Sequence, residues 1–192
     1  MRHLLTRILV CLALFSVPPA AGAVPMAYDL ETDSSVVGFA WMLGPDTVKG
    51  TMPVKRADMV IDFDSAANTR VAVALDVTGA VAGFPFATQG MKSRKVLWAD
   101  RYPEITFEST AIRPDADGAE VDGLLTVRGI TKPVTFRAQL YRQKGTVPGD
   151  RDRMAIVVTG SLSRAAFGAD GWAGMAGDTV DLTILARIRR KE

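Results

Sequence analysis

Residues 120–140, EVDGLLTVRGITKPVTFRAQL, contain two segments in which apolar and polar side chains alternate on either side of a short turn. The apolar positions are Val121, Leu125 and Val127 in the first segment, and Val134, Phe136, Ala138 and Leu140 in the second. A period of two is typical of a strand that buries one face. Residues 128–133 between the segments contain glycine and proline, which are common in turns. This stretch therefore predicts an antiparallel β-hairpin.

The same alternation recurs along most of the chain. It is present in residues 35–42, 57–64, 70–78, 105–108, 120–127, 134–140, 154–162 and 180–188. These segments predict eight or nine strands with one apolar and one polar face, and Asp62 and Asp64 fall on the polar face. Such strands hide their apolar faces by pairing two sheets or by closing one sheet into a barrel. Residues 86–99 lack the alternation, and we expect one short helix there that stops before Tyr102-Pro103.

The first 23 residues have the features of a secretory signal peptide. Arg2 and Arg7 make the first seven residues basic, residues 8–17 are apolar, and Ala21-Gly22-Ala23 fits the small-residue cleavage pattern. The apolar run is too short to span a bilayer. We therefore expect a signal peptide at 1–23 and a periplasmic protein whose single domain covers residues 24–192.

Composition excludes several classes of function for residues 24–192. The sole histidine and the sole cysteine, His3 and Cys11, both lie in the expected signal peptide. The remaining chain cannot form a Ser-His-Asp triad, a thiol nucleophile, a disulfide or a Cys/His zinc site. It has 21 basic and 21 acidic residues, which argues against nucleic-acid binding. We therefore expect no nucleic acid as a partner and no metal site.

Alternation alone does not say which face of a barrel points inward. An outer-membrane barrel also alternates, with its apolar face toward lipid. Charged residues near the centres of the expected strands, such as Asp76, Asp122 and Arg137, would then all need partners in a narrow lumen. The aromatic residues are also too scattered to form two girdles. These features favour a soluble barrel whose apolar face points inward.

Several ordered segments resemble the YceI-like family of exported lipid-binding proteins. The matching segments are residues 28–30, 34–39, 48–52, 91–98, 102–110, 121–134 and 160–168. The stretch from Val121 to Val134 is the most specific. The last segment, Arg164-Ala165-Ala166-Phe167-Gly168, is similar to the Arg-x-x-Phe-Gly motif of the family.

The resemblance implies a lipocalin-like eight-stranded antiparallel barrel with one short helix. It further implies an apolar tunnel that holds an isoprenoid lipid, either a polyprenyl quinone or a prenyl phosphate, as the bound ligand. Family members have no established catalytic activity across the family, so the resemblance implies no enzymatic activity and no cofactor apart from the bound lipid. Some members are fused to, or encoded beside, b-type cytochromes. A membrane cytochrome is therefore a candidate partner.

The expected ligand-binding residues are apolar side chains on the inward faces, on the helix and on two glycine-rich or proline-containing loops. They are Val37, Phe39, Trp41, Ile61, Phe63, Val73, Leu75, Phe84, Phe86, Leu97, Trp98, Phe107, Leu125, Phe136, Ile156, Phe167 and Trp172, and the wall also includes Val71, Val121 and Val158. For any one strand residue, ordinary core packing is a more common explanation than ligand contact, and the loop residues could form either an entrance or a plug. Lys92, Arg94 and Arg164 are candidate head-group contacts, although such a cluster is more often a solvated helix face.

Three functions remain open at this point. The first is a carrier for isoprenoid lipids. The second is a hydrolase or isomerase that acts on a lipid-like substrate through carboxylates such as Asp62 or Glu108. The third is an interaction module for a membrane b-type cytochrome, with a filled barrel. A contiguous cavity distinguishes the first from the third.

Overall fold

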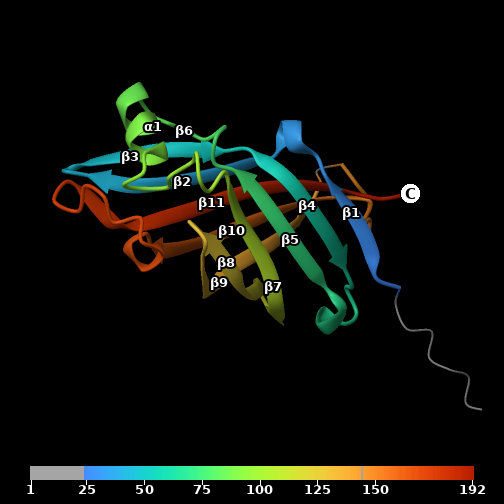
Figure 1. Ribbon diagram of the computed structural model, residues 1–192. Coiled ribbons are helices and arrows are strands. Elements are labelled where there is room, and N and C mark those ends of the chain that lie inside the picture. Colours follow the sequence, from blue (N-terminus) through green and yellow to red (C-terminus); the bar gives the residue numbers. More distant parts are fainter. Residues whose placement is uncertain (1–23, 144) are drawn as a thin grey trace, which may run out of the picture.

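The computed structural model describes residues 24–143 and 145–192, and the predicted signal peptide lies outside them. Eleven strand segments form one antiparallel sheet that curls into an elongated barrel (Figure 1). The strands are β1 (Met26–Leu30), β2 (Val36–Leu43), β3 (Asp46–Met52), β4 (Val54–Ile61), β5 (Arg70–Asp76), β6 (Val81–Ala82), β7 (Glu104–Asp115), β8 (Gly118–Val127), β9 (Ile130–Arg142), β10 (Arg153–Ser163) and β11 (Ala176–Arg190). The helices are α1 (Pro85–Lys92) and the 3-10 turns η1 (Thr32–Ser34), η2 (Ala66–Asn68) and η3 (Ala165–Phe167).

Strand β1 closes the barrel. It pairs with β4 through Tyr28 and Met59 on one side, and with β11 through Tyr28 and Arg190 on the other. The closed ring is β1-β4-β5-β7-β8-β9-β10-β11, which is the predicted eight-stranded antiparallel barrel. Tyr28 is fully buried at this closure, and its hydroxyl donates a hydrogen bond of 2.9 Å to the carbonyl of Arg151.

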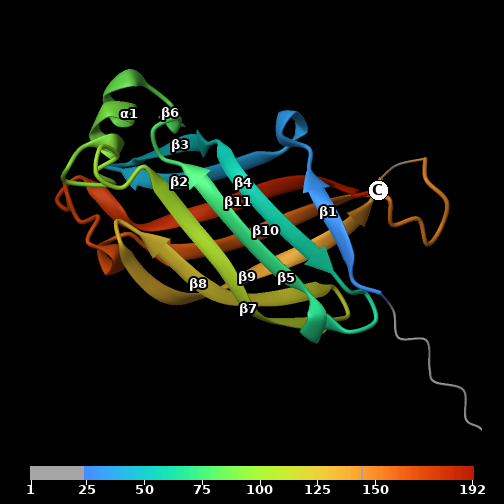
Figure 2. The same cartoon turned by 45° about the vertical axis from the view of Figure 1, so that its right-hand side comes forward.

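Two barrel strands are interrupted at their midpoints. Strands β1 and β2 lie along the same edge of β11, separated by η1, and β3 runs into β4 through Pro53. Beyond this break β4 pairs with β5, whereas β3 pairs with the short strand β6. Strand β6 contacts α1, so that the helix lies at this end of the barrel, opposite the C-terminus (Figures 1 and 2).

The helix is shorter than the sequence predicted. It begins with Pro85 at its first position, where proline costs no hydrogen bond, and it ends at Lys92 instead of continuing to residue 99. The N–H of Leu97 bonds to the carbonyl of Met91, and the N–H of Ala99 bonds to that of Lys92. These bonds satisfy the last helical carbonyls and turn the chain away from the helix axis.

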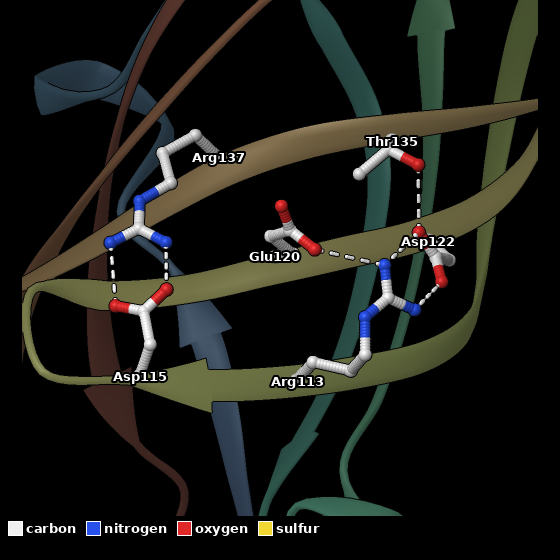
Figure 3. Close-up of polar contacts among 6 residues, drawn as sticks. All are labelled: Arg113, Asp115, Glu120, Asp122, Thr135 and Arg137. Carbon is white, nitrogen blue, oxygen red and sulfur yellow. Dashed lines mark hydrogen bonds and ion pairs between the residues drawn. The ribbon is translucent and has the colours of Figure 1, made fainter.

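The polar faces of β7, β8 and β9 carry a ladder of charges on the outside of the barrel (Figure 3). The guanidinium of Arg113 bonds to both carboxylate oxygens of Asp122 and to Glu120, while Arg137 binds both carboxylate oxygens of Asp115. These residues alternate with inward apolar neighbours, so the apolar face points inward as predicted. Among the described residues, no helix is both long enough and apolar enough to cross a membrane.

Candidate functional site

The interior of the barrel encloses a cavity of about 1150 Å³. Ligand sites for drug-sized molecules commonly occupy about 300–1000 Å³, so the cavity exceeds that range. Sixteen of the seventeen expected ligand-binding residues line it: Val37, Phe39, Trp41, Ile61, Phe63, Val73, Leu75, Phe84, Phe86, Leu97, Phe107, Leu125, Phe136, Ile156, Phe167 and Trp172. The lining also includes Val71, Val121 and Val158. The expected wall therefore surrounds an open space and not a filled core.

The cavity is elongated along the barrel. Its lining on β11 extends from Ala176 to Ala186, which corresponds to about 33 Å of extended strand. It begins at the helix end with residues such as Phe86 and Trp172, and it reaches Ile61 and Phe63 near the opposite end. This shape matches a long and slender ligand.

Cross-strand glycines keep the lumen open. The ring of Phe136 lies over Gly160 of the neighbouring strand, where an added Cβ would be 2.5 Å from the ring. Phe39 lies over Gly50 in the same way, as does Phe107 over Gly123. Because these glycines have no side chain, the rings lie close to the sheet backbone instead of extending across the barrel.

The cavity opens at the helix end. Phe84, Phe86, Trp172 and Met175 line it, yet their exposed fractions are 42%, 82%, 48% and 58%. Phe84 and Phe86 flank the start of α1, and the other two lie on the loop before β11. Side chains folded back as a plug would be buried. These residues instead form an apolar rim.

Arg164 lines the cavity beside this rim, but most of its hydrogen-bonding capacity is used within the protein. It is buried, and four of its five N–H groups donate to the backbone carbonyls of Ala169, Gly171, Ala176 and Gly177. Arg164 therefore holds the loop before β11 in place. One N–H group, on Nη2, has no acceptor among the described residues.

Three expected site residues lie outside the cavity. Trp98 follows the end of α1 with a φ of 50°, and the guanidinium groups of Arg94 and Arg101 each lie 4.8 Å from the centre of its ring. Lys92 donates to the carbonyl of Thr78. Neither Lys92 nor Arg94 is part of the lining, because the chain leaves the helix axis at Ser93 and directs these cations outward.

Asp62 and Asp64 line the far end of the cavity, although the sequence placed them on the polar face. The expectation was wrong because β4 ends at Ile61, where the alternation stops. Asp62 accepts hydrogen bonds from the Asn68 side chain and from the N–H groups of Asp64 and Ser65. The Asn68 bond is the main cause that holds the pKa of Asp62 below its usual value.

The Asp62 carboxylate accepts the hydrogen bonds of this turn and stays ionised, which makes it a poor proton donor to a substrate. Glu108, the other carboxylate considered for catalysis, is not among the lining residues. Within residues 24–143 and 145–192, no group of three or more acidic, histidine or cysteine side chains is placed to hold a metal ion.

Some lining residues were not expected at the site. Ile105, Leu182 and Ile184 line the cavity, and each belongs to an alternating segment whose inward face could have been extended to include it. Ala119 of β8 also lines it, paired with Ala138 of β9, which the alternation places on the apolar face. Ala119 carries no comparable sequence signature, because alanine is common on both faces of a sheet.

Comparisons with known proteins agree with this architecture. The sequence profile of the YceI-like domain matches residues 28–188. Protein YceI of Escherichia coli O17:K52:H18 is 29% identical over 150 residues, covering 77% of this chain and 74% of its own. The crystal structure of Burkholderia cenocepacia BcnA superposes with a TM-score of 0.67 at 20% identity, covering 83% of this chain and 99% of that one.

A polyisoprenoid binding domain from Saccharophagus degradans has the same fold, with a TM-score of 0.63 at 13% identity and coverage of 86% and 99% of the two chains. The profile match spans the barrel from Tyr28 in the closing strand β1 to Ile188 near the end of β11. It includes the segments on which the sequence resemblance was based. The chain belongs to the YceI-like family.

Proposed function

We propose that this protein binds one isoprenoid lipid, a polyprenyl quinone or a prenyl phosphate, in the barrel cavity and carries it through the periplasm. The observation that carries the proposal is the elongated apolar cavity of about 1150 Å³. The similarity in fold to a polyisoprenoid binding domain supports the choice of lipid class. A binding protein that is not an enzyme also agrees with the two carboxylates considered for catalysis, because that of Asp62 is engaged in a turn and Glu108 lies outside the lining.

The hydrophobic effect is sufficient for tight binding. Burial of one methylene contributes about 0.8 kcal/mol, so a five-carbon unit contributes roughly 4 kcal/mol before ordering costs. Micromolar affinity requires about 8 kcal/mol. Only a few isoprene units are therefore needed, and the length of the lining on β11, from Ala176 to Ala186, leaves room for them.

The head group is expected at the helix end. Arg164 is the cation that lines the cavity there, and its uncommitted N–H group can donate to a quinone carbonyl or to a phosphate oxygen. At the opposite end the lining includes the carboxylates of Asp62 and Asp64, which would repel a phosphate. The polar end of the ligand would thus remain near the opening.

The open cavity counts against an interaction module with a filled barrel. Binding to a membrane b-type cytochrome stays a prediction, since a lipid-loaded barrel could also deliver a quinone to such a partner.

Native mass spectrometry of gently purified protein tests the proposal. We expect a co-purified molecule whose mass and fragments identify a prenyl chain. Ala138→Trp places a large ring in the cavity and should remove the adduct, whereas Gln139→Trp, on the opposite face of β9, should retain it. Circular dichroism would show that both variants fold. Protein that is consistently free of ligand and that fails to take up prenyl quinones would refute the function.

A further inference from the structure

The opening of the cavity is surrounded by a distinct surface, here called the mouth surface. Its apolar part is the rim of Phe84, Phe86, Trp172 and Met175, which is joined by the exposed side chain of Val81 on β6. Its basic part is Lys92, Arg94, Lys95 and Arg101, from the end of α1 and the turn that follows. Figures 1 and 2 show α1 and the loop before β11 at the same end of the barrel.

The basic residues of the mouth surface form no direct ion pair with the described acidic side chains, although Asp100 and Asp170 lie on the same two loops. None of the ion pairs formed by the described residues includes Lys92, Arg94, Lys95 or Arg101. The opposite end also carries cations, but three of them are paired: Arg153 with Glu31, Arg190 with Asp152 and Lys191 with Asp29. Arg187 and Arg189 near that end are unpaired as well among the described side chains. The mouth surface differs in that its four unpaired cations adjoin the exposed apolar rim of the cavity.

Three of the four cations contact tryptophan rings instead. The ammonium of Lys95 lies 4.8 Å from the ring centre of Trp172, and the guanidinium groups of Arg94 and Arg101 each lie 4.8 Å from the ring centre of Trp98. Tryptophan and basic side chains together are typical of protein surfaces that lie at the head-group level of a bilayer. In that position the ring enters the interface and the cation meets a lipid phosphate.

The rim is continuous with the cavity and is held in place. Phe86 and Trp172 belong to the cavity lining as well as to the exposed surface. The N–H of Gly171 bonds to the carbonyl of Lys95 over 3.0 Å, and Arg164 binds the carbonyl of Gly171 over 2.7 Å. The loop before β11 is thus tied to the turn that follows α1, and a lipid that leaves a bilayer at this point would enter the cavity directly.

We infer that the mouth surface docks on an anionic lipid bilayer, with Phe86, Trp172 and Met175 in the interface and the four cations against lipid phosphates. This inference rests on the proposed function and specifies where the lipid is exchanged. Exposed apolar side chains select a bilayer over a soluble polyanion, and the unpaired cations select an anionic bilayer over a zwitterionic one.

Flotation of the protein with vesicles tests the inference. Wild-type protein should bind vesicles of phosphatidylcholine mixed with phosphatidylglycerol more tightly than vesicles of phosphatidylcholine alone. A rise in ionic strength from about 0.1 M to 1 M shortens the Debye length from about 10 Å to 3 Å and should weaken binding. Brominated acyl chains should quench tryptophan fluorescence, and Trp172→Phe should lose much of that quenching.

Two double variants carry matched charge changes. Arg94→Gln/Lys95→Gln removes two cations of the mouth surface, and at roughly five-fold for each charge the vesicle affinity should fall about 25-fold. Arg187→Gln/Arg189→Gln removes two exposed cations near the opposite end of the barrel and should leave vesicle affinity unchanged. Equal losses in both variants, equal binding to both kinds of vesicle, or an absence of vesicle binding would each overturn the inference.

A second assay separates this inference from the proposed function. Uptake of a short prenyl alcohol in the absence of vesicles should be the same in wild type and in Arg94→Gln/Lys95→Gln. Uptake without vesicle binding would overturn the docking surface and leave the carrier function standing. Vesicle binding without prenyl uptake would refute the carrier function. If rim substitutions abolish association with a purified protein partner while vesicle binding is unaffected, the surface is a protein interface and the bilayer is excluded.

Discussion

Substitution of Gly160 by alanine tests whether cross-strand glycines keep the cavity open. Gly160 lies in β10, and a Cβ at this position would be 2.5 Å from Cδ1 and 3.2 Å from Cε1 of Phe136. The three atoms nearest to that Cβ all belong to the ring of Phe136, so the backbone itself does not obstruct the new methyl group. The variant therefore acts on the aromatic ring alone.

The size of the effect follows from the geometry. Carbon atoms pack best at about 3.5–4.0 Å, so the ring must move by at least about 1 Å, and the sheet behind it leaves only the cavity side. Without a clash, alanine in a strand is favoured over glycine by about 0.5–1 kcal/mol, whereas overpacking costs about 1–3 kcal/mol. We expect unfolding free energy to fall by as much as about 2.5 kcal/mol.

Ligand binding should fall as well. If the displaced ring excludes one to three methylene groups at about 0.8 kcal/mol each, affinity for a prenyl quinone should weaken about 4-fold to 60-fold. Urea unfolding and quenching of tryptophan fluorescence by the quinone measure the two effects. Phe136→Leu removes the ring. Gly160→Ala should therefore lower the free energy of unfolding much less in the Phe136→Leu background than in wild type. The reasoning is refuted if the Gly160→Ala variant is more stable than wild type and binds the prenyl quinone with unchanged affinity.

Three further substitutions test other parts of the structure. Arg164→Met leaves four carbonyl partners without their donor and should destabilise the protein by about 3 kcal/mol or more in urea unfolding. Arg164→Lys should recover only part of this stability, because lysine lacks the planar guanidinium group. Hydrogen bonds from Arg137 lower the pKa of Asp115 from 3.8 to about 2, so this stabilisation is present above pH 3.8 and is lost as the pH falls toward 2. Asp115→Asn should therefore be less stable than wild type at pH 7 and approach it near pH 2 in thermal unfolding; a constant difference would contradict this. Tyr28→Phe removes the hydrogen bond to the Arg151 carbonyl and should lower the free energy of unfolding by about 1 kcal/mol, which lowers the melting temperature by about 2–4 °C. An unchanged melting temperature would show that this bond does not stabilise the barrel closure.

Much of the fold could be predicted from alternation, and the differences have local physical causes. The hairpin of β8 and β9 was predicted, but its turn is only Arg128-Gly129, with φ values of 53° and 74°, which is typical of a tight two-residue connection. Pro133 was expected in the turn and instead lies in β9, opposite Leu124. Strand β9 pairs with β10 only from Arg137 onward, so proline is tolerated at this free edge.

The candidate site was less accessible to sequence reasoning where regular structure ends. Inward strand residues such as Phe39 and Leu125 follow directly from a period of two. The positions of Asp62 and Trp98 do not follow from it, because each lies outside a regular strand or helix. There the direction of a side chain depends on the hydrogen bonds of a turn, and a repeating sequence pattern does not encode those bonds. The interruption of the strands by η1 and Pro53 is likewise a tertiary feature that allows β6 and α1 to cover one end.

Alternation alone cannot distinguish a filled barrel from a hollow one, because both need an apolar inner face. The placement of glycine relative to phenylalanine does distinguish them. A phenylalanine that faces a bulky neighbour must extend across the lumen, whereas Phe136 beside Gly160 and Phe107 beside Gly123 can lie along the wall. These pairs become visible only when the strand register is known, since the two partners of each pair lie on different strands. Cross-strand pairing of inward aromatic residues with glycine is therefore the feature by which the hollow interior is encoded in this chain.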